Sequence, residues 1–247
     1  MDLNADLGEG FGRWELTDDV ALLRLVTSAN VACGFHAGDP ITLQRVCAAA
    51  ARRGVRIGAQ VSYRDLAGFG RREMDVPPEE LAAETAYQIG ALQVFARAAG
   101  TEVRYVKPHG ALYHRAGRDA AQAGAVVEGM RLAGVDVLLC PLGSELDRAA
   151  REAGLSVVGE CFADRAYRRD GRLVPRGGPG ALLGREAAVA QAVDLAARGE
   201  VTAVDGSRVR VEAASLCVHG DGPEAVATAA AIRSALDDKG IEVEAFL

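Results

Sequence analysis

The sequence lacks any concentration of positive charge. Its 247 residues include 34 acidic and 28 basic side chains, which give a formal net charge of −6, and no run of Lys or Arg exceeds two residues. Proteins that bind nucleic acids present a basic surface to the phosphate backbone. We therefore expect no nucleic-acid partner.

Cysteine is scarce and is not arranged as a disulfide framework or a metal motif. The five cysteines are Cys33, Cys47, Cys140, Cys161 and Cys217. Their odd number and dispersed spacing, without Cys-x-x-Cys, predict small buried residues in a reducing compartment. We expect no secretory leader, and the apolar runs are far too short for a bilayer. We therefore expect a cytoplasmic protein with no membrane partner.

What the sequence does have is a regular alternation of strand-like and helix-like segments. The expected strands are residues 2–7, 26–33, 55–61, 103–106, 136–140, 156–160, 215–219 and 241–246. The expected helices are residues 17–25, 40–53, 78–99, 119–133, 144–153, 185–198 and 225–239. A hairpin over residues 201–211, with a tight turn at Asp205-Gly206, interrupts the alternation. Asp221 and Pro223 are expected to start the last helix.

This order predicts a parallel sheet with right-handed crossovers, either a closed barrel or an open doubly wound sheet. Polar residues favour the barrel, because they gather at the carboxyl ends of the predicted strands, where α/β barrels carry their sites. We therefore expect one α/β domain over residues 1–247, built as an irregular (β/α) barrel of about seven strands. The residues expected around its mouth are Asn4, Asp6, Glu9, Asn30, His36, Gln60, Lys107, His109 and His219.

Residues 103–114, VRYVKPHGALYH, are the stretch around which the rest of the chain is best organised. Its β-branched and aromatic residues predict a strand, which is broken by the proline and glycine that follow. Lys107 and His109 lie at the break, two residues apart and so on one face of an extended chain. A lysine in this position is costly to bury unless it is paired, and Asp6 and Glu9 are its candidate partners.

Other strand ends also carry polar chemistry. Asp2, Asn4 and Asp6 share one face of the first strand, which is either the wet side of an edge strand or the lining of a site. His36 lies in the loop before a helix that Asp39 is expected to cap. All four histidines of the chain lie at or just past strand ends, which scattered core or surface histidines would not do. The pattern indicates a site at this end of the strands.

Signatures of particular chemistries are missing. No Walker phosphate-binding motif follows the glycine-rich residues 8–12, and no nucleophile elbow is present. Arg71 is either an anion-binding residue or an ordinary surface residue. A metal site is conceivable from Asp6, His36, His109 and His219. None of their spacings is a metal motif, so whether the chain binds a metal stays unknown.

Six segments of the chain resemble the LamB/YcsF family. They are DLNADLGEG (2–10), SANVACGFHAGDP (28–40), GFGRR (68–72), VKPHGALY (106–113), FADR (162–165) and CVHGD (217–221). The resemblance implies an irregular (β/α) barrel akin to the glycoside hydrolase and polysaccharide deacetylase superfamily. It also implies the role of the A subunit in an ATP-dependent 5-oxoprolinase that works with partner subunits B and C.

The reaction that the resemblance implies is hydrolysis of 5-oxo-L-proline to L-glutamate, driven by ATP together with Mg²⁺. An unactivated lactam is a poor electrophile, so we expect phosphorylation of the lactam oxygen followed by attack of water. Lys107 is then expected to neutralise phosphate or oxyanion charge, and Asp6 or His109 to act as the base for water. The residues expected to bind substrate are Asn4, Glu9, Asn30, His36, Gln60, Arg71 and His219.

One departure from the family pattern bears on the chemistry, because Gln60 stands where the family usually has His. Two alternatives to the implied function remain open at this point. The chain is either a non-catalytic subunit that binds the small molecule while its partners do the chemistry, or a metal-dependent deacetylase on the same fold.

Overall fold

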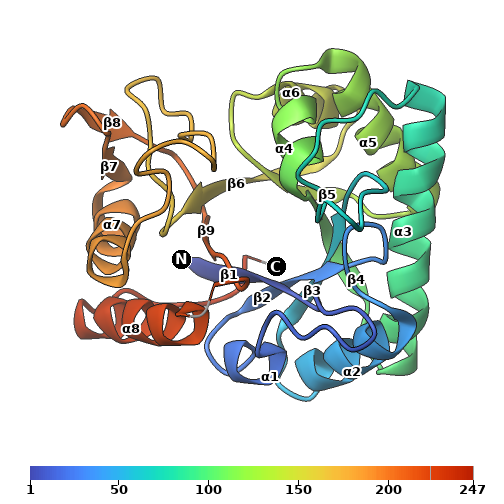
Figure 1. The fold of residues 1–247 in the computed structure, drawn as a ribbon, viewed down its shortest axis with the longest axis horizontal. Coiled ribbons are helices and arrows are strands. Elements are labelled where there is room, and N and C mark those ends of the chain that lie inside the picture. The colour runs from blue at the N-terminus through green and yellow to red at the C-terminus, as the bar shows by residue number, and fades with distance from the viewer. Residues whose placement is uncertain (223, 247) are drawn as a thin grey trace.

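Seven parallel strands close into a barrel in the computed structural model, which describes residues 1–222 and 224–246 (Figure 1). The strands are β1 (Asp2–Leu7), β2 (Ser28–Ala32), β3 (Arg56–Val61), β4 (Val103–Pro108), β5 (Val137–Cys140), β6 (Ser156–Phe162) and β9 (Ser215–Val218). They neighbour one another in chain order, and β9 pairs with β1 to close the ring, with Asn4 opposite Cys217. The closed, seven-stranded barrel that the sequence predicts is confirmed, and the open doubly wound sheet is excluded.

Helices surround the barrel on its outside (Figure 1). They are α1 (Asp19–Leu22), α2 (Pro40–Ala51), α3 (Pro78–Ala98), α4 (Gly110–Ala116), α5 (Ala120–Ala133), α6 (Glu145–Glu152), α7 (Arg185–Arg198) and α8 (Ala225–Asp238). The 21-residue α3 packs on α5, and α7 packs on α8. Across the described residues, no helix combines the length and the apolar character that crossing a membrane would require.

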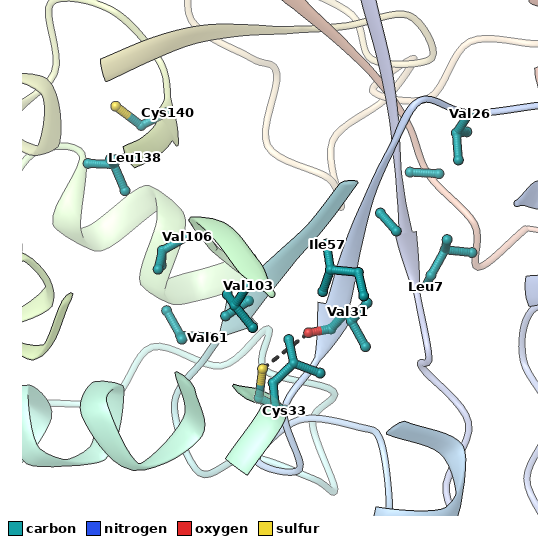
Figure 2. Close-up of a cluster of buried hydrophobic side chains, with 14 of the residues drawn as sticks. Leu7, Val26, Val31, Cys33, Ile57, Val61, Val103, Val106, Leu138 and Cys140 are labelled. Atoms are coloured by element: carbon teal, nitrogen blue, oxygen red, sulfur yellow. Dashed lines mark hydrogen bonds between the residues drawn. The ribbon is translucent and has the colours of Figure 1, made fainter. Parts of the chain in front are cut away.

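The hydrophobic core lies between the outer face of the barrel and the helices. Alternation in β1 sends Leu3, Ala5 and Leu7 outward into this core, where each is fully buried. Figure 2 shows the same layer where the outward side chains of β2 to β5 meet, among them Val31, Ile57, Val61, Val106 and Leu138. Because the apolar side chains of the strands point outward, the inward positions can be polar. Most (β/α) barrels instead fill this interior with branched aliphatic side chains.

Local sequence signals place several helices as predicted. The Asp39 side chain accepts hydrogen bonds from the backbone amides of Ile41 (2.9 Å) and Thr42 (3.2 Å), so Asp39 caps α2. Asp18 caps α1 by accepting from the Ala21 amide at 3.0 Å. α1 is shorter than the helix predicted over residues 17–25, and its first residue is drawn inward, since Asp19 accepts from the backbone amide of Gly8 at 2.9 Å.

Two predictions near the carboxyl terminus are wrong. Asp221 does not cap α8, because its carboxylate is bound by Arg71 and Arg176, and charge-assisted bonds of this kind are stronger than bonds to backbone amides. Pro223, expected beside it, lies outside the described residues. Residues 241–246 form no strand. The Glu244 amide donates to the Met1 carbonyl at 3.2 Å, but β9 already pairs with the edge of β1 that a further strand would need.

Two smaller predictions also need correction. The hairpin forms from β7 (Glu200–Thr202) and β8 (Arg208–Arg210), but a tight two-residue turn at Asp205-Gly206 is wrong, because residues 203–207 form the connection. The Asp205 side chain holds this longer loop by accepting from the Ser207 amide at 3.0 Å. α4 was not predicted, because its seven residues are too few to display a helical period.

Candidate functional site

Lys107 projects from the end of β4 into the barrel and lies between two carboxylates. Its ammonium nitrogen is 3.1 Å from Asp6 Oδ1 and 2.7 Å from Glu160 Oε1, so β1, β4 and β6 each supply one ionisable group. All three side chains are buried. We call Asp6, Lys107 and Glu160 the lysine centre. Asp6 is confirmed as a partner of Lys107, whereas the second partner is Glu160 and not Glu9.

The lysine centre holds a fixed ion pair. Burial alone would lower the pKa of Lys107, but the field of Asp6, Cys217 and Glu160 raises it well above its ordinary value. Burial alone would raise the pKa of Asp6, yet Lys107 lowers it below its usual range. Burial prevails at Glu160 and raises its pKa, although Lys107 opposes this and the Tyr113 hydroxyl donates to it at 2.9 Å. Lys107 and Asp6 therefore carry the charges.

Hydrogen-bonded amides fill the barrel beneath the lysine centre. Asn4 donates to Ser215 Oγ at 2.7 Å and accepts from Asn30 at 2.7 Å. Asn30 also donates to Asp6 Oδ1 at 3.0 Å and accepts from the Tyr105 hydroxyl at 2.7 Å. Neither asparagine is exposed to solvent. Their contacts position Asp6 and Lys107, and their predicted role in binding substrate directly stays a prediction.

A second polar group, formed by Glu9, His36 and His109, lies in the same mouth. Glu9 Oε1 is 3.5 Å from His36 Nε2 and 3.6 Å from His109 Nδ1. The two imidazole rings are stacked, with centroids 3.9 Å apart and planes at 10°. We call these three residues the histidine cluster. One ligand atom from each of the three residues lies within 4.8 Å of the other two, so the cluster could hold a metal ion.

Gln60 joins His109 to the covering loop. The Gln60 amide nitrogen donates to His109 Nδ1 at 3.0 Å, and His109 Nε2 donates to the Phe69 carbonyl at 3.0 Å. This pattern fits the neutral tautomer that carries its proton on Nε2. Burial lowers the pKa of His36 to about 4 and that of His109 well below its ordinary value, and it raises the pKa of Glu9 well above its ordinary value. The two imidazoles are therefore neutral around neutral pH, and burial opposes the ionisation of Glu9.

The loop after β3, residues 62–72, covers the histidine cluster. The Phe69 ring stands edge-on to both imidazoles, with centroid distances of 5.5 Å to His36 and 5.4 Å to His109. Phe69 has a φ of 55°, a left-handed backbone that costs a residue with a bulky side chain about 1 kcal/mol or more. Gly70 has to be glycine here, because a Cβ would come within 2.9 Å of both imidazole side chains.

His219 is held by a carboxylate and is the most accessible of the three histidines that line the mouth. Its Nδ1 lies 2.9 Å from Asp164 Oδ1, and its backbone amide donates to Asp164 Oδ2 at 3.1 Å. The Phe162 ring stacks on the imidazole with centroids 5.6 Å apart. Burial alone would lower the pKa of His219, but Asp164 outweighs it and raises the pKa. With Nδ1 engaged and the side chain 13% exposed, Nε2 remains for a ligand.

Two arginines meet one carboxylate at the rim. Arg71 of the covering loop lies 2.5 Å from Asp221 Oδ2, and Arg176 lies 2.9 Å from Asp221 Oδ1. The Arg71 guanidinium also lies over the Phe69 ring, 4.8 Å from its centroid. Three loops, those after β3, β6 and β9, are thus joined by ion pairs above the site. Arg71 is no isolated surface residue.

The predicted site residues converge, although they do not all make the same kind of contact. Asp6 and Lys107 belong to the lysine centre. His36, His109 and Glu9 belong to the histidine cluster. The remaining predicted residues lie around these two groups: Gln60, Asn4, Asn30, Arg71 and His219.

A cavity of about 370 Å³ opens elsewhere, beside residues 157–159 and 212–214. The side chains of the mouth are mostly buried beneath its covering loop.

Sequence reasoning missed four residues of the site: Glu160, Asp164, Arg176 and Asp221. Glu160 lies near the carboxyl end of a predicted strand, so the rule that selected Asp6 could have selected it as well. Asp164 lies just past the end of the same strand, where that rule also applies. Arg176 and Asp221 come from long loops, and nothing in their local sequence indicates that the loops meet.

The fold and the site define a (β/α)-barrel protein with a charged, water-excluding site at the carboxyl ends of its strands. The sequence profile of the LamB/YcsF family matches residues 1–247. The chain belongs to the LamB/YcsF family. It is 65% identical over 248 residues to the A subunit of 5-oxoprolinase from Streptomyces avermitilis, and the match covers 100% of this chain and 99% of the relative. The corresponding A subunit from Nocardia farcinica is 58% identical with the same coverage.

Solved structures agree with this placement. The crystal structure of a lactam utilization protein from Thermus thermophilus superposes with a TM-score of 0.94 at 44% identity, covering 100% of this chain and 99% of that one. A family 4 carbohydrate esterase from Streptomyces lividans reaches a TM-score of only 0.46 at 12% identity, over 100% of this chain and 92% of the esterase. A likeness at that level says nothing about chemistry.

Proposed function

We propose that this chain is the A subunit of an ATP-dependent 5-oxoprolinase, which opens the lactam ring of 5-oxo-L-proline to give L-glutamate. The observation that carries the proposal is the match, over essentially the whole of both chains, to 5-oxoprolinase A subunits at 58–65% identity. The site supports it, because it offers a fixed cation, two carboxylates and a carboxylate-held imidazole at one end of the barrel. These groups suit the opening of an amide bond.

Lys107 is the residue we assign to charge stabilisation. Because Asp6 and Glu160 keep it protonated inside the barrel, its ammonium is a preorganised donor for the negative charge that develops on a lactam or phosphoryl oxygen. Asp6 is charged but already bonded to Lys107, whereas His109 is neutral and carries a lone pair on Nδ1. Either remains a candidate base for water, and breaking the Gln60 bond is the step that frees His109.

The substrate-binding residues are assigned to the rim and the histidine cluster. His219 presents Nε2 to the substrate while Asp164 holds the ring from behind. Arg71 lies where a carboxylate of the substrate would be attracted, since its guanidinium already binds the Asp221 carboxylate. Glu9, His36 and Gln60 form the inner wall. Substrate reaches this wall only when residues 62–72 move, since His36 and Gln60 have no exposed surface.

ATP, with Mg²⁺, and the partner subunits B and C complete the proposed enzyme. The sequence has no Walker motif, so we assign nucleotide handling to the assembly and not to a recognisable phosphate loop of this chain. The proposal is tested by glutamate release from 5-oxoproline with ATP and Mg²⁺, using the chain alone, the partners alone and the three together. We expect activity only from the complete mixture. Full activity of the chain alone, or none from the complete mixture, would contradict it.

A further inference from the structure

Buried polar atoms without partners are concentrated in and beside the histidine cluster. Among the described residues, no hydrogen-bond partner is found for Glu9 Oε1, for either ring nitrogen of His36, or for Gln60 Oε1. An unpaired buried polar atom costs about 1–3 kcal/mol, and folded proteins keep such atoms few. Four such atoms lie on three neighbouring side chains. Their lone pairs and N–H groups are therefore available to a bound ligand.

The separations within the histidine cluster are those of metal ligands. Glu9 Oε1 lies 3.5 Å from His36 Nε2 and 3.6 Å from His109 Nδ1, which is beyond hydrogen-bond reach. Four ligands at about 2.1 Å from a tetrahedral ion lie about 3.4 Å from one another. Both distances are close to this edge length, and the carboxylate oxygen is the atom common to them. The two imidazoles are stacked in near-parallel planes, whereas an imidazole binds a metal in its own ring plane, so one ring must turn out of the stack when the ion binds.

We propose that Glu9, His36 and His109 bind a divalent transition-metal ion, with Zn²⁺ as the ion whose ligand preferences they fit best. One carboxylate oxygen and two imidazole nitrogens are a donor set that suits zinc, and they leave a fourth position open. Gln60 borders this position: its amide lies 3.0 Å from His109 Nδ1, and rotating the amide by half a turn would direct Oε1 at the ion.

The neighbouring structure is that of a supported metal site. His109 Nε2 donates to the Phe69 carbonyl, which fixes the ring and leaves Nδ1 as the ligand atom. With an ion bound, His109 is no longer available as a base, and Asp6 is the remaining candidate. The Phe69 ring covers both imidazoles and excludes water. The lysine centre lies outside the ligand set, because its carboxylates are already bound to Lys107. A bound ion would supply a Lewis acid for a carbonyl or phosphoryl oxygen.

The experiment measures zinc binding by the isolated full-length chain, without substrate, ATP or partners. The protein is stripped with a chelator, reloaded with Zn²⁺ and analysed for metal content, and the affinity is measured by competition with a chromophoric chelator. Co²⁺ replaces Zn²⁺ in a parallel sample to report tetrahedral geometry by visible absorption. The variants are Glu9→Gln, His36→Asn and His109→Gln, each checked for folding by circular dichroism. The matched control is His114→Asn, which changes a histidine outside the cluster.

We expect about one Zn²⁺ per chain in the wild type and in His114→Asn, and a loss of affinity of at least about 100-fold in folded variants of the cluster. Zinc should raise the melting temperature of the first two proteins only. The proposal is overturned if no protein retains stoichiometric zinc, or if cluster variants bind it as tightly as the control. Neither result bears on whether the complete assembly opens 5-oxoproline, so the two proposals can fail separately.

Discussion

Lys107 and His36 are both deeply buried at the same end of the barrel, yet their surroundings differ. The Lys107 ammonium has carboxylates at 3.1 Å and 2.7 Å, whereas neither ring nitrogen of His36 has a hydrogen-bond partner in the described part of the chain. Lys107 is compensated within the chain, and His36 is not. Removing one member of a buried ion pair leaves its partner buried and unpaired, whereas removing a group that has no partner breaks no bond.

The largest effect is expected from Lys107→Met. The substitution leaves the Asp6 carboxylate buried without its counter-charge, so the free energy of unfolding should fall by about 3–5 kcal/mol. Turnover of the assembled enzyme should fall by about two orders of magnitude or more, as it does when an oxyanion donor is lost. Chemical denaturation and glutamate release measure the two effects.

The control for Lys107→Met is the double variant Lys107→Met/Asp6→Asn. Removing both charges should recover much of the lost stability and none of the turnover. If the single variant were as stable as the wild type, the ion pair would not be compensating for burial, and the first half of the comparison would be refuted.

His36→Leu should have the opposite effect on stability. In metal-free protein it removes two unpaired buried nitrogens, so the free energy of unfolding should stay constant or rise by about 1 kcal/mol, while activity is lost. The same change at His219, which is bonded to Asp164 at 2.9 Å, should lower stability by about 1–3 kcal/mol. Equal destabilisation by both substitutions would argue that His36 is stabilising the fold after all. Thermal unfolding in the presence of a chelator makes the measurement.

Asp164→Asn tests the one histidine whose pKa is raised. The stabilisation that Asp164 gives to the His219 imidazolium is fully present below the ordinary pKa of 6.5 and is lost as pH rises through the higher folded-state pKa. The stability difference between wild type and variant should therefore be largest near about pH 5.5 and shrink towards about pH 9. NMR titration should show a lower His219 pKa in the variant. A difference that grows with rising pH would contradict the assignment.

Arg71→Ala should give the smallest change in stability. The Arg71 side chain is 35% exposed, and partly exposed ion pairs contribute at most about 1 kcal/mol. If Arg71 binds the substrate carboxylate, KM for 5-oxoproline should rise about tenfold, which corresponds to about 1.4 kcal/mol, with little change in kcat. Arg185→Ala, which removes an exposed pair with Glu224, is the control and should change neither constant. A fall in kcat alone would show that Arg71 does not act through substrate binding.

The barrel could be predicted from sequence because its signals are local and repeated. Strand-like runs followed by capped helices, such as the one that begins after Asp39, recur often enough to define the order of elements. The last strand, predicted over residues 241–246, could not be excluded from sequence, because its absence follows from the closure of β9 on β1. Asp221 failed as a predicted cap for a similar reason, since its partners come from two distant loops.

The site was predictable in its members but not in their pairing. Lys107, His109 and Asp6 could be selected because each lies at a strand end. The sequence named Asp6 and Glu9 as candidate partners of Lys107, and it missed Glu160. The pairing depends on which strands face one another across the barrel, and that is set by register. Likewise, the stacking of His36 on His109 brings together residues 73 positions apart, which no local pattern indicates.

Crystals of the full-length chain grown with Zn²⁺ would test the difference between the two regions most directly. An anomalous difference map at the zinc absorption edge locates the ion without reference to activity. We predict one strong peak bounded by Glu9, His36 and His109 and none at the lysine centre, where the Lys107 ammonium already contacts both carboxyl groups. A map with no peak at the histidine cluster, or with its main peak beside Asp6 and Glu160, would contradict the account.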